Sequence, residues 1–141
     1  MSKLIVGLLL SCALISCSGD DKSNSDAPPL REYLFGIEGY EDGSEDFVAA
    51  TDDETVIAAL DAQLSLPIDE RTMFINGDIA AGDAGYNLPW SWHFVESEWE
   101  LTEFAIEVCD GLPSFVEDDL DYWLNTVGSF CPWGAYVKEA L

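Results

Sequence analysis

The chain has 141 residues, a length typical of one domain with a short leader. With 48% hydrophobic and 12% aromatic residues it can form a packed core, which excludes a wholly disordered chain. It carries 28 acidic and 5 basic residues, a formal net charge of −23. Because nucleic acids and anionic membrane surfaces are both bound through Lys and Arg, this charge argues against either as a partner. The acidity is consistent with solubility alone, or with a surface that binds cations or a basic partner.

The N-terminal segment has the pattern of a targeting signal. Lys3 precedes Leu4–Ile15, an uncharged run of 12 residues, whereas a membrane-spanning helix needs about 20. The run ends in Leu-Ile-Ser-Cys17, which resembles the lipobox of bacterial lipoproteins. The resemblance implies a signal peptide over 1–17 and a lipidated Cys17 whose acyl chains hold the protein on a bilayer. The alternative is an ordinary cleaved signal with an incidental cysteine.

Residues beyond the lipobox indicate where the protein is sorted and how it is divided. By the lipoprotein sorting rule, Ser18 favours the outer membrane if the source has one. Residues 18–29 are small, polar and end in proline, as expected for a flexible tether. Residues 30–141 are then a single extracytoplasmic domain.

Two cysteines, Cys109 and Cys131, remain in that domain. An even pair outside the cytoplasm predicts one disulfide, which would add about 3 kcal/mol of stability in the chain-entropy model. A metal site is the alternative, but two thiols and the single histidine, His93, make a poor zinc set.

The first half of the domain predicts two strands and a helix. Strands are expected over 33–38 and 46–50, separated by a glycine-containing loop over 39–45. Thr51 and Glu54 have the spacing of a capping box at the start of a helix. Apolar residues then follow at helical spacing (Val56, Ile57, Leu60, Leu64), and Leu66-Pro67 ends the helix.

The second half predicts three strands, a helix and a short last strand or tail. The strands cover 72–79, with a possible bulge at Gly77, then 89–95 and 99–109, with a loop over 80–88 and a turn over 96–98. Period-two alternation places Trp90, Trp92 and Phe94 on one strand face, and Phe104, Ile106 and Val108 on another. A capping box of Ser114 and Glu117 opens the helix, which ends at Gly128, and 135–140 is the last segment.

This order of elements predicts an α+β fold. We expect one antiparallel sheet of four to six strands with two helices packed on one face and one disulfide.

Several of these segments together resemble a known family. They are Pro89-Trp-Ser-Trp-His93, Ile106-Glu-Val-Cys-Asp110 and Cys131-Pro-Trp133, with Thr51-Asp52 before a helix and Val116-Glu117. The chain resembles the calmodulin-binding-protein-like small secreted domains, labelled after the N-terminal domain of a seventy-four-kilodalton calmodulin-binding protein. The resemblance implies a compact domain without an established activity. Calmodulin binding itself is doubtful here, because acidic calmodulin grips basic amphipathic helices and this chain has none.

The candidate ligand-binding residues are Ser91, His93, Glu107 and Asn87. Ser91 and His93 share a strand face, so a Ser-His-carboxylate arrangement is conceivable, although a structural role for the histidine is favoured. Glu107 could be a partly buried acid paired with His93 or Arg71, and Asn87 lies in the loop 80–88. No residue is assigned as catalytic.

No cofactor or metal is expected, although calcium is left open. Asp42, Ser44 and Asp46 alternate as in a calcium loop, but Phe47 stands where an EF-hand requires glycine.

We therefore expect a surface-anchored bacterial lipoprotein that acts as a non-enzymatic binding module for an unknown protein or small ligand. The alternatives are a small extracytoplasmic hydrolase using His93 with a carboxylate, and a protease inhibitor that presents the loop 80–88.

Overall fold

The computed structural model describes residues 28–141, so the lipobox, Cys17 and nearly all of the predicted tether lie outside the described residues. Six strands are present: β1 (Arg31–Ile37), β2 (Phe47–Thr51), β3 (Phe74–Ala81), β4 (Trp92–Thr102), β5 (Ser129–Phe130) and β6 (Ala135–Ala140). The helices are α1 (Glu54–Leu64), α2 (Pro113–Asp118) and α3 (Leu120–Tyr122), and the short helical turns are η1 (Ile68–Glu70), η2 (Glu107–Cys109) and η3 (Trp123–Val127).

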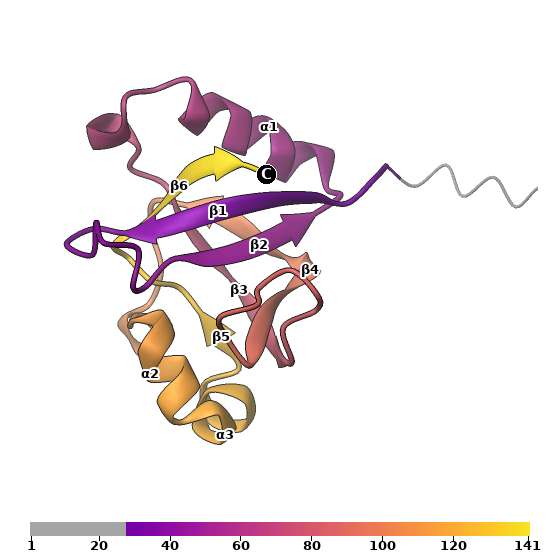
Figure 1. Cartoon of the computed structure of the whole chain (residues 1–141), viewed down its shortest axis with the longest axis vertical. Helices are drawn as coiled ribbons and strands as arrows, with labels where there is room; N and C mark the ends of the chain where they lie inside the picture. The colour runs from indigo at the N-terminus through magenta and orange to yellow at the C-terminus, as the bar shows by residue number, and fades with distance from the viewer. Residues whose placement is uncertain (1–27) are drawn as a thin grey trace, which may run out of the picture.

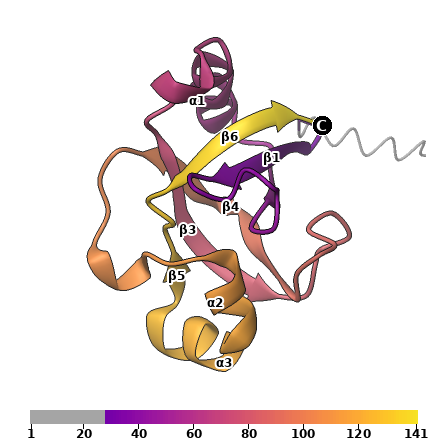
Figure 2. The same cartoon turned by 60° about the vertical axis from the view of Figure 1, so that its left-hand side comes forward.

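The strands form two antiparallel sheets of three strands each, in the orders β2-β1-β6 and β4-β3-β5. The predicted α+β class with antiparallel pairing and one disulfide is thus confirmed, whereas the single sheet is wrong. The two helices do not share one face either. Figure 1 and Figure 2 show α1 at one end of the domain and α2 with α3 at the other.

The core lies where the two sheets face each other, and its centre is aromatic. Phe47 of β2 stacks on Phe35 at 5.2 Å between ring centroids, and packs against Trp92 and Phe94 of β4 at 5.9 and 5.7 Å. Phe130 of β5 closes the cluster. Period-two alternation therefore placed Trp92 and Phe94 correctly, since both are fully buried, while Trp90 is half-buried.

The outer edge of β2 is joined to the second sheet by side chains instead of by a strand. Trp90 Nε1 donates to the Asp46 carbonyl at 2.8 Å, and Trp99 Nε1 donates to the Ala50 carbonyl at 2.9 Å. Between these two, the Val48 N–H donates to Asn87 Oδ1 at 2.8 Å. Buried backbone groups need partners, and these three side chains supply them. This is the physical reason why the chain forms two sheets joined at an edge.

The predicted turn over 96–98 is wrong, because these residues lie within β4. The β3–β4 ladder instead changes register there: Gly77 pairs with Trp99, but Ile79 pairs with Phe94. A Cβ on Gly77 would lie 2.3 Å from the Trp99 Cβ, so only glycine fits at this crossing. The bulge expected at Gly77 is confirmed, and it absorbs the extra residues that had suggested a turn.

Both predicted capping boxes are wrong. Asp53 caps α1 by accepting from the N–H groups of Thr55 and Val56, while Thr51 accepts from the Asp53 N–H. The side chains of Ser114 and Glu117 do not form a box either. The helix starts after Leu112, the Ser114 N–H donates to buried Glu45, and Glu117 reaches Ser91.

The helix predicted over 113–127 is divided at Asp119. This residue leaves the helical conformation (φ −140°, ψ 58°), and its carboxylate accepts from the Tyr122 N–H to start α3. The predicted end at Gly128 is confirmed, because this glycine adopts φ 80° in the left-handed region.

Candidate functional site

Ser91 and His93 are not paired with each other by a hydrogen bond in the structure. The Ser91 hydroxyl donates to Glu117 Oε1 at 2.8 Å, and its N–H donates to Glu117 Oε2 at 2.8 Å. His93 Nδ1 lies 2.7 Å from the Gly82 carbonyl, and Tyr86 meets the imidazole ring edge-on. Because that carbonyl can only accept, Nδ1 carries the proton in this contact. Ser91 thus fastens α2 to the second sheet, and His93 fastens the loop before β4.

Asn87 is fully buried and uses both ends of its amide. Its Oδ1 accepts from Val48, as described above, and its Nδ2 donates to the Trp92 carbonyl at 2.8 Å. The structure thus places this candidate ligand residue inside the fold, at the base of the loop between β3 and β4.

The loop between β3 and β4 is held rigidly beyond Asn87. Tyr86 donates its hydroxyl to the Phe94 carbonyl and to Glu96, at 3.2 and 3.0 Å. Partial burial, with the hydrogen bond to Glu96, raises the pKa of the Tyr86 hydroxyl above its usual value. Leu88, the next residue after Asn87, is 69% exposed. The loop therefore presents an apolar side chain from a fixed base.

Glu107 is exposed, contrary to the expected partly buried pair with His93 or Arg71. The Arg71 guanidinium instead donates to carbonyl oxygens, including those of Val137 at 2.7 Å and Leu66 at 3.0 Å. These bonds tie the segment before β3 to β6, so Arg71 has no donor directed at Glu107.

The predicted strand over 99–109 ends early, and this exposes its apolar face. β3 begins at Phe74, which pairs with Thr102, so the residues beyond Thr102 have no partner strand. Phe104, Ile106 and Val108 are consequently 85%, 69% and 59% exposed. We call residues 103–108 the apolar loop. The expectation that these three side chains form a buried strand face is wrong.

The disulfide fixes the C-terminal end of the apolar loop. Cys109 and Cys131 are bonded, as predicted, with 22 residues of separation and both side chains buried. The Cys131 N–H also donates to the Cys109 carbonyl at 2.8 Å. At the other end, Thr72 donates its hydroxyl to Glu103 at 3.0 Å. The apolar side chains are therefore exposed on a segment that is anchored at both ends.

A groove of about 590 Å³ borders the apolar loop. It lies between η1 and the turn before β6, and Ile68, Trp133 and Tyr136 give it apolar walls. Thr72, which binds Glu103, also lines it. The Trp133 N–H donates to Asp110 Oδ1 at 2.9 Å, so the other end of the apolar loop is tied to the groove as well.

Sequence reasoning missed this groove. In the sequence, Trp133 stands out only as part of a Cys-Pro-Trp-Gly turn, and Ile68 does not stand out at all. Their one sequence signal is large apolar side chains beside proline or glycine, where turns are exposed. Ile68 is 56% and Trp133 is 45% exposed.

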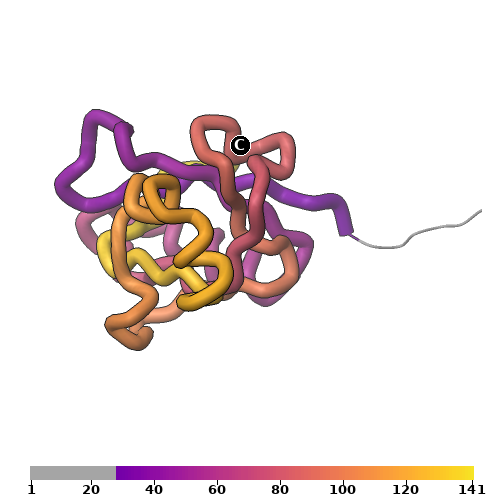
Figure 3. Tube along the Cα trace, turned by 90° about the horizontal axis from the view of Figure 1, so that it is seen from below, coloured from indigo at the N-terminus to yellow at the C-terminus, as the bar shows by residue number. Residues whose placement is uncertain are grey.

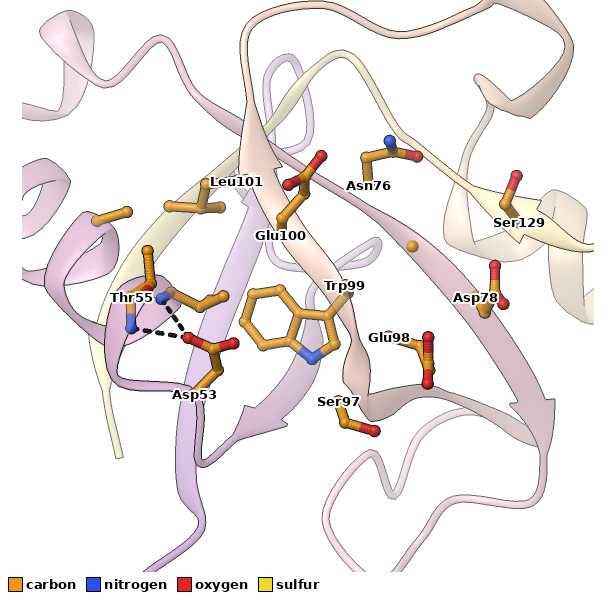
Figure 4. Close-up of a pocket in the computed structure, with 13 residues that line it drawn as sticks. Asp53, Thr55, Asn76, Asp78, Ser97, Glu98, Trp99, Glu100, Leu101 and Ser129 are labelled. Atoms are coloured by element: carbon orange, nitrogen blue, oxygen red, sulfur yellow. Dashed lines mark hydrogen bonds between the residues drawn. The ribbon is translucent and has the colours of Figure 1, made fainter. Parts of the chain in front are cut away.

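A second hollow, of about 690 Å³, lies beside β3 and β4 (Figure 4). Asp78, Glu98 and Glu100 line it, together with the Asp53 cap of α1. Within residues 28–141, no three His, Cys, Asp or Glu side chains are grouped so that they could hold a metal ion. At the candidate calcium loop, Asp42 accepts from the N–H and hydroxyl of Ser44, and these bonds lower the pKa of Asp42.

The loop 82–91 and the apolar loop project from opposite sides of the domain (Figures 2 and 3). The two candidate contact surfaces are therefore separate. In the described part of the chain, no helix is long and apolar enough to cross a bilayer.

Comparison with known proteins gives one family. Residues 32–141 match the family model of the N-terminal domain of the seventy-four-kilodalton calmodulin-binding protein. Neither the curated proteins nor the solved structures compared with the chain give a match.

Proposed function

The chain belongs to the family of the N-terminal domain of the seventy-four-kilodalton calmodulin-binding protein. From this premise we propose that it is a surface-anchored, non-enzymatic binding module whose contact surface is the apolar loop. The observation that carries the proposal is the exposure of Phe104, Ile106 and Val108. Contiguous exposed apolar side chains bordered by polar residues are a common feature of interaction sites. Glu103 and Glu107, which alternate with them, supply such a border.

Rigidity supports this reading of the apolar loop. The disulfide and the Thr72–Glu103 hydrogen bond hold its two ends, so little conformational entropy would be lost when a partner binds. The same side chains make no contribution to the buried core, so their apolar character is not explained by folding.

Anchoring is the second part of the proposal, and its support is the lipobox at Cys17. Feeding cells that express the chain an alkyne-bearing fatty acid should label the protein. Replacing Cys17 with Ser should abolish the label, whereas the matched change Cys12→Ser should leave it. A Cys17→Ser protein that is still labelled would contradict lipid attachment at Cys17.

Position-resolved crosslinking in the native host tests the binding surface. A photo-reactive benzoylphenylalanine replaces Phe104 in one protein and Tyr122, which is 45% exposed on α3, in a control. We expect a discrete adduct with a partner from position 104 and none from position 122. Equal adducts from both positions, or none from position 104, would contradict the assignment of the surface.

A protease inhibitor is the second candidate, and the pair of Asn87 and Leu88 favours it. A buried amide that fixes the base of a protruding loop, followed by an exposed leucine, is a geometry that could resist a protease while filling its specificity pocket. Proteases that accept leucine should then be inhibited by the protein, and Leu88→Asp should remove the inhibition. The third alternative, a hydrolase, has no supporting contact among residues 28–141, since Ser91 binds Glu117 and His93 binds Gly82.

A further inference from the structure

We propose that the groove between η1 and the turn before β6 takes a lysine or arginine side chain from a basic, amphipathic segment of a partner protein, while the apolar loop takes that segment's apolar side chains. This inference rests on the proposed function and adds the chemistry of the partner. Its two elements are the groove lined by Trp133 and the apolar loop tied to it.

The two elements form one continuous surface. Thr72 lines the groove and binds Glu103 at the start of the apolar loop, at 3.0 Å. Trp133 also lines the groove, and its N–H binds Asp110, just after the loop, at 2.9 Å. A segment seated on the loop would therefore reach the groove without crossing another part of the domain.

The groove has the chemistry of a site for a cationic side chain. Trp133 and Tyr136 offer aromatic surface, and the face of an aromatic ring attracts ammonium and guanidinium groups. Glu38 and Asp69 line the same groove and are exposed, and within residues 28–141 their carboxylates form no ion pair. They can therefore pair with an incoming cation.

Arg71 is the one basic residue that lines the groove, and it does not reverse this preference. Its Nε and Nη1 donate to the carbonyls of Leu66, Val137 and Lys138 at 3.0, 2.7 and 3.0 Å. These donors are thereby used within the fold and are not offered to an anionic ligand.

The overall charge favours the same class of partner. The chain carries −23, and of its five basic residues Arg31, Arg71 and Lys138 lie in the described part. Lys138 is paired with Asp46 at 2.6 Å. Such a charge steers basic partners toward the domain and repels acidic ones. An anionic membrane would be repelled too.

A basic peptide fits this surface better than a sugar does. A sugar could stack on Trp133 and bond to Glu38, but it would leave Phe104, Ile106 and Val108 uncovered. An amphipathic segment covers both parts, because its apolar and basic residues lie on adjacent faces.

Fluorescence anisotropy with labelled synthetic peptides tests the proposal on the purified full chain. The probes are a lysine–leucine peptide, a glutamate–leucine peptide of the same length, and a lysine–serine peptide of the same charge. We expect the lysine–leucine peptide to bind at least about 10-fold more tightly than either of the others. Its affinity should fall as NaCl is raised.

Matched variants separate the groove from general attraction to an acidic protein. Trp133→Ala should weaken binding about 10-fold, with partial recovery in Trp133→Phe. The double change Glu38→Gln and Asp69→Asn should weaken it about 5-fold, whereas Glu98→Gln with Asp118→Asn, which removes the same charge elsewhere, should change it less than about 2-fold. Thermal unfolding of each variant checks that the fold is kept.

Three results would overturn the proposal. They are equal losses in the groove and control charge pairs, equal binding of the glutamate–leucine peptide, and binding of an oligosaccharide such as cellohexaose in place of the peptide. The proposed function is judged separately, by crosslinking at position 104. If that adduct forms and the groove variants still bind normally, the module survives and the basic-partner inference fails. If peptide binding depends on the groove but no adduct forms, the inference stands and the assigned role of the apolar loop in cells fails.

Discussion

Asn87 accepts a hydrogen bond from the N–H of Val48, a residue 39 positions earlier in the chain, at 2.8 Å. The same amide donates to the Trp92 carbonyl at 2.8 Å. One buried side chain thus satisfies the edge of β2 and the start of β4, and it joins the two sheets beside the base of the loop 82–91.

Replacing Asn87 with Ala should destabilise the domain by about 2–5 kcal/mol. The change leaves a buried N–H and a buried carbonyl without partners, and each such group costs about 1–3 kcal/mol. Urea unfolding at neutral pH measures the loss. The control is Asn125→Ala, which removes an exposed amide bonded only to Asp121 and should cost less than about 0.5 kcal/mol. Equal losses in the two variants would contradict the role of Asn87 as a buried link.

Replacing both Cys109 and Cys131 with Ser should lower the free energy of unfolding by about 3 kcal/mol. The bond closes a loop with 22 residues of separation, and its removal frees the unfolded chain. It should also increase amide hydrogen exchange in the apolar loop, whose C-terminal end the disulfide holds. An unchanged urea midpoint, with exchange in the loop also unchanged, would show that the bond neither stabilises the fold nor fixes the loop.

Tyr86 predicts a loss of stability at alkaline pH. Burial, and then the hydrogen bond to Glu96, raise the pKa of its hydroxyl above the ordinary value of 10.0. The folded state therefore holds the proton more tightly than the unfolded state does. This contribution is fully present below pH 10 and is lost as the pH rises toward the higher pKa of the folded state.

Tyr86→Phe should accordingly flatten the dependence of the unfolding free energy on pH above pH 10. A residual slope should remain, because the pKa values of Tyr33 and Lys138 are also raised, by burial and by the hydrogen bond from Lys138 to Asp46 respectively. Denaturant unfolding at a series of pH values measures both proteins. Identical slopes would show that Tyr86 is not held neutral by the fold.

The sequence predicted elements better than it predicted their partners. Alternation correctly placed Trp92 and Phe94 in the core, and Gly77 correctly indicated a bulge. The same alternation at Phe104, Ile106 and Val108 predicted a strand, but a period of two cannot reveal that the partner strand ends at Phe74.

The candidate site shows the same limit. Ser91, His93 and Asn87 are candidates in the sequence because their polar groups stand among tryptophans. Their actual partners, Glu117, Gly82 and Val48, are between 11 and 39 residues away in the chain. Contacts over such separations depend on how the two sheets meet, which no local pattern encodes. The groove at Trp133 was missed for the same reason, because η1 and the last turn meet only in the folded domain.

Nuclear magnetic resonance mapping of the bound peptide is the most direct test of the binding surface. The isotope-labelled chain is titrated with the lysine–leucine peptide, and shifts are followed for backbone amides and for the five tryptophan indole N–H groups. We predict the largest shifts at Phe104, Ile106 and the Trp133 indole, with the loop 82–91 and α3 unchanged. Shifts spread evenly over the acidic surface, or concentrated at Leu88, would contradict the assignment of the apolar loop and its groove as the binding surface.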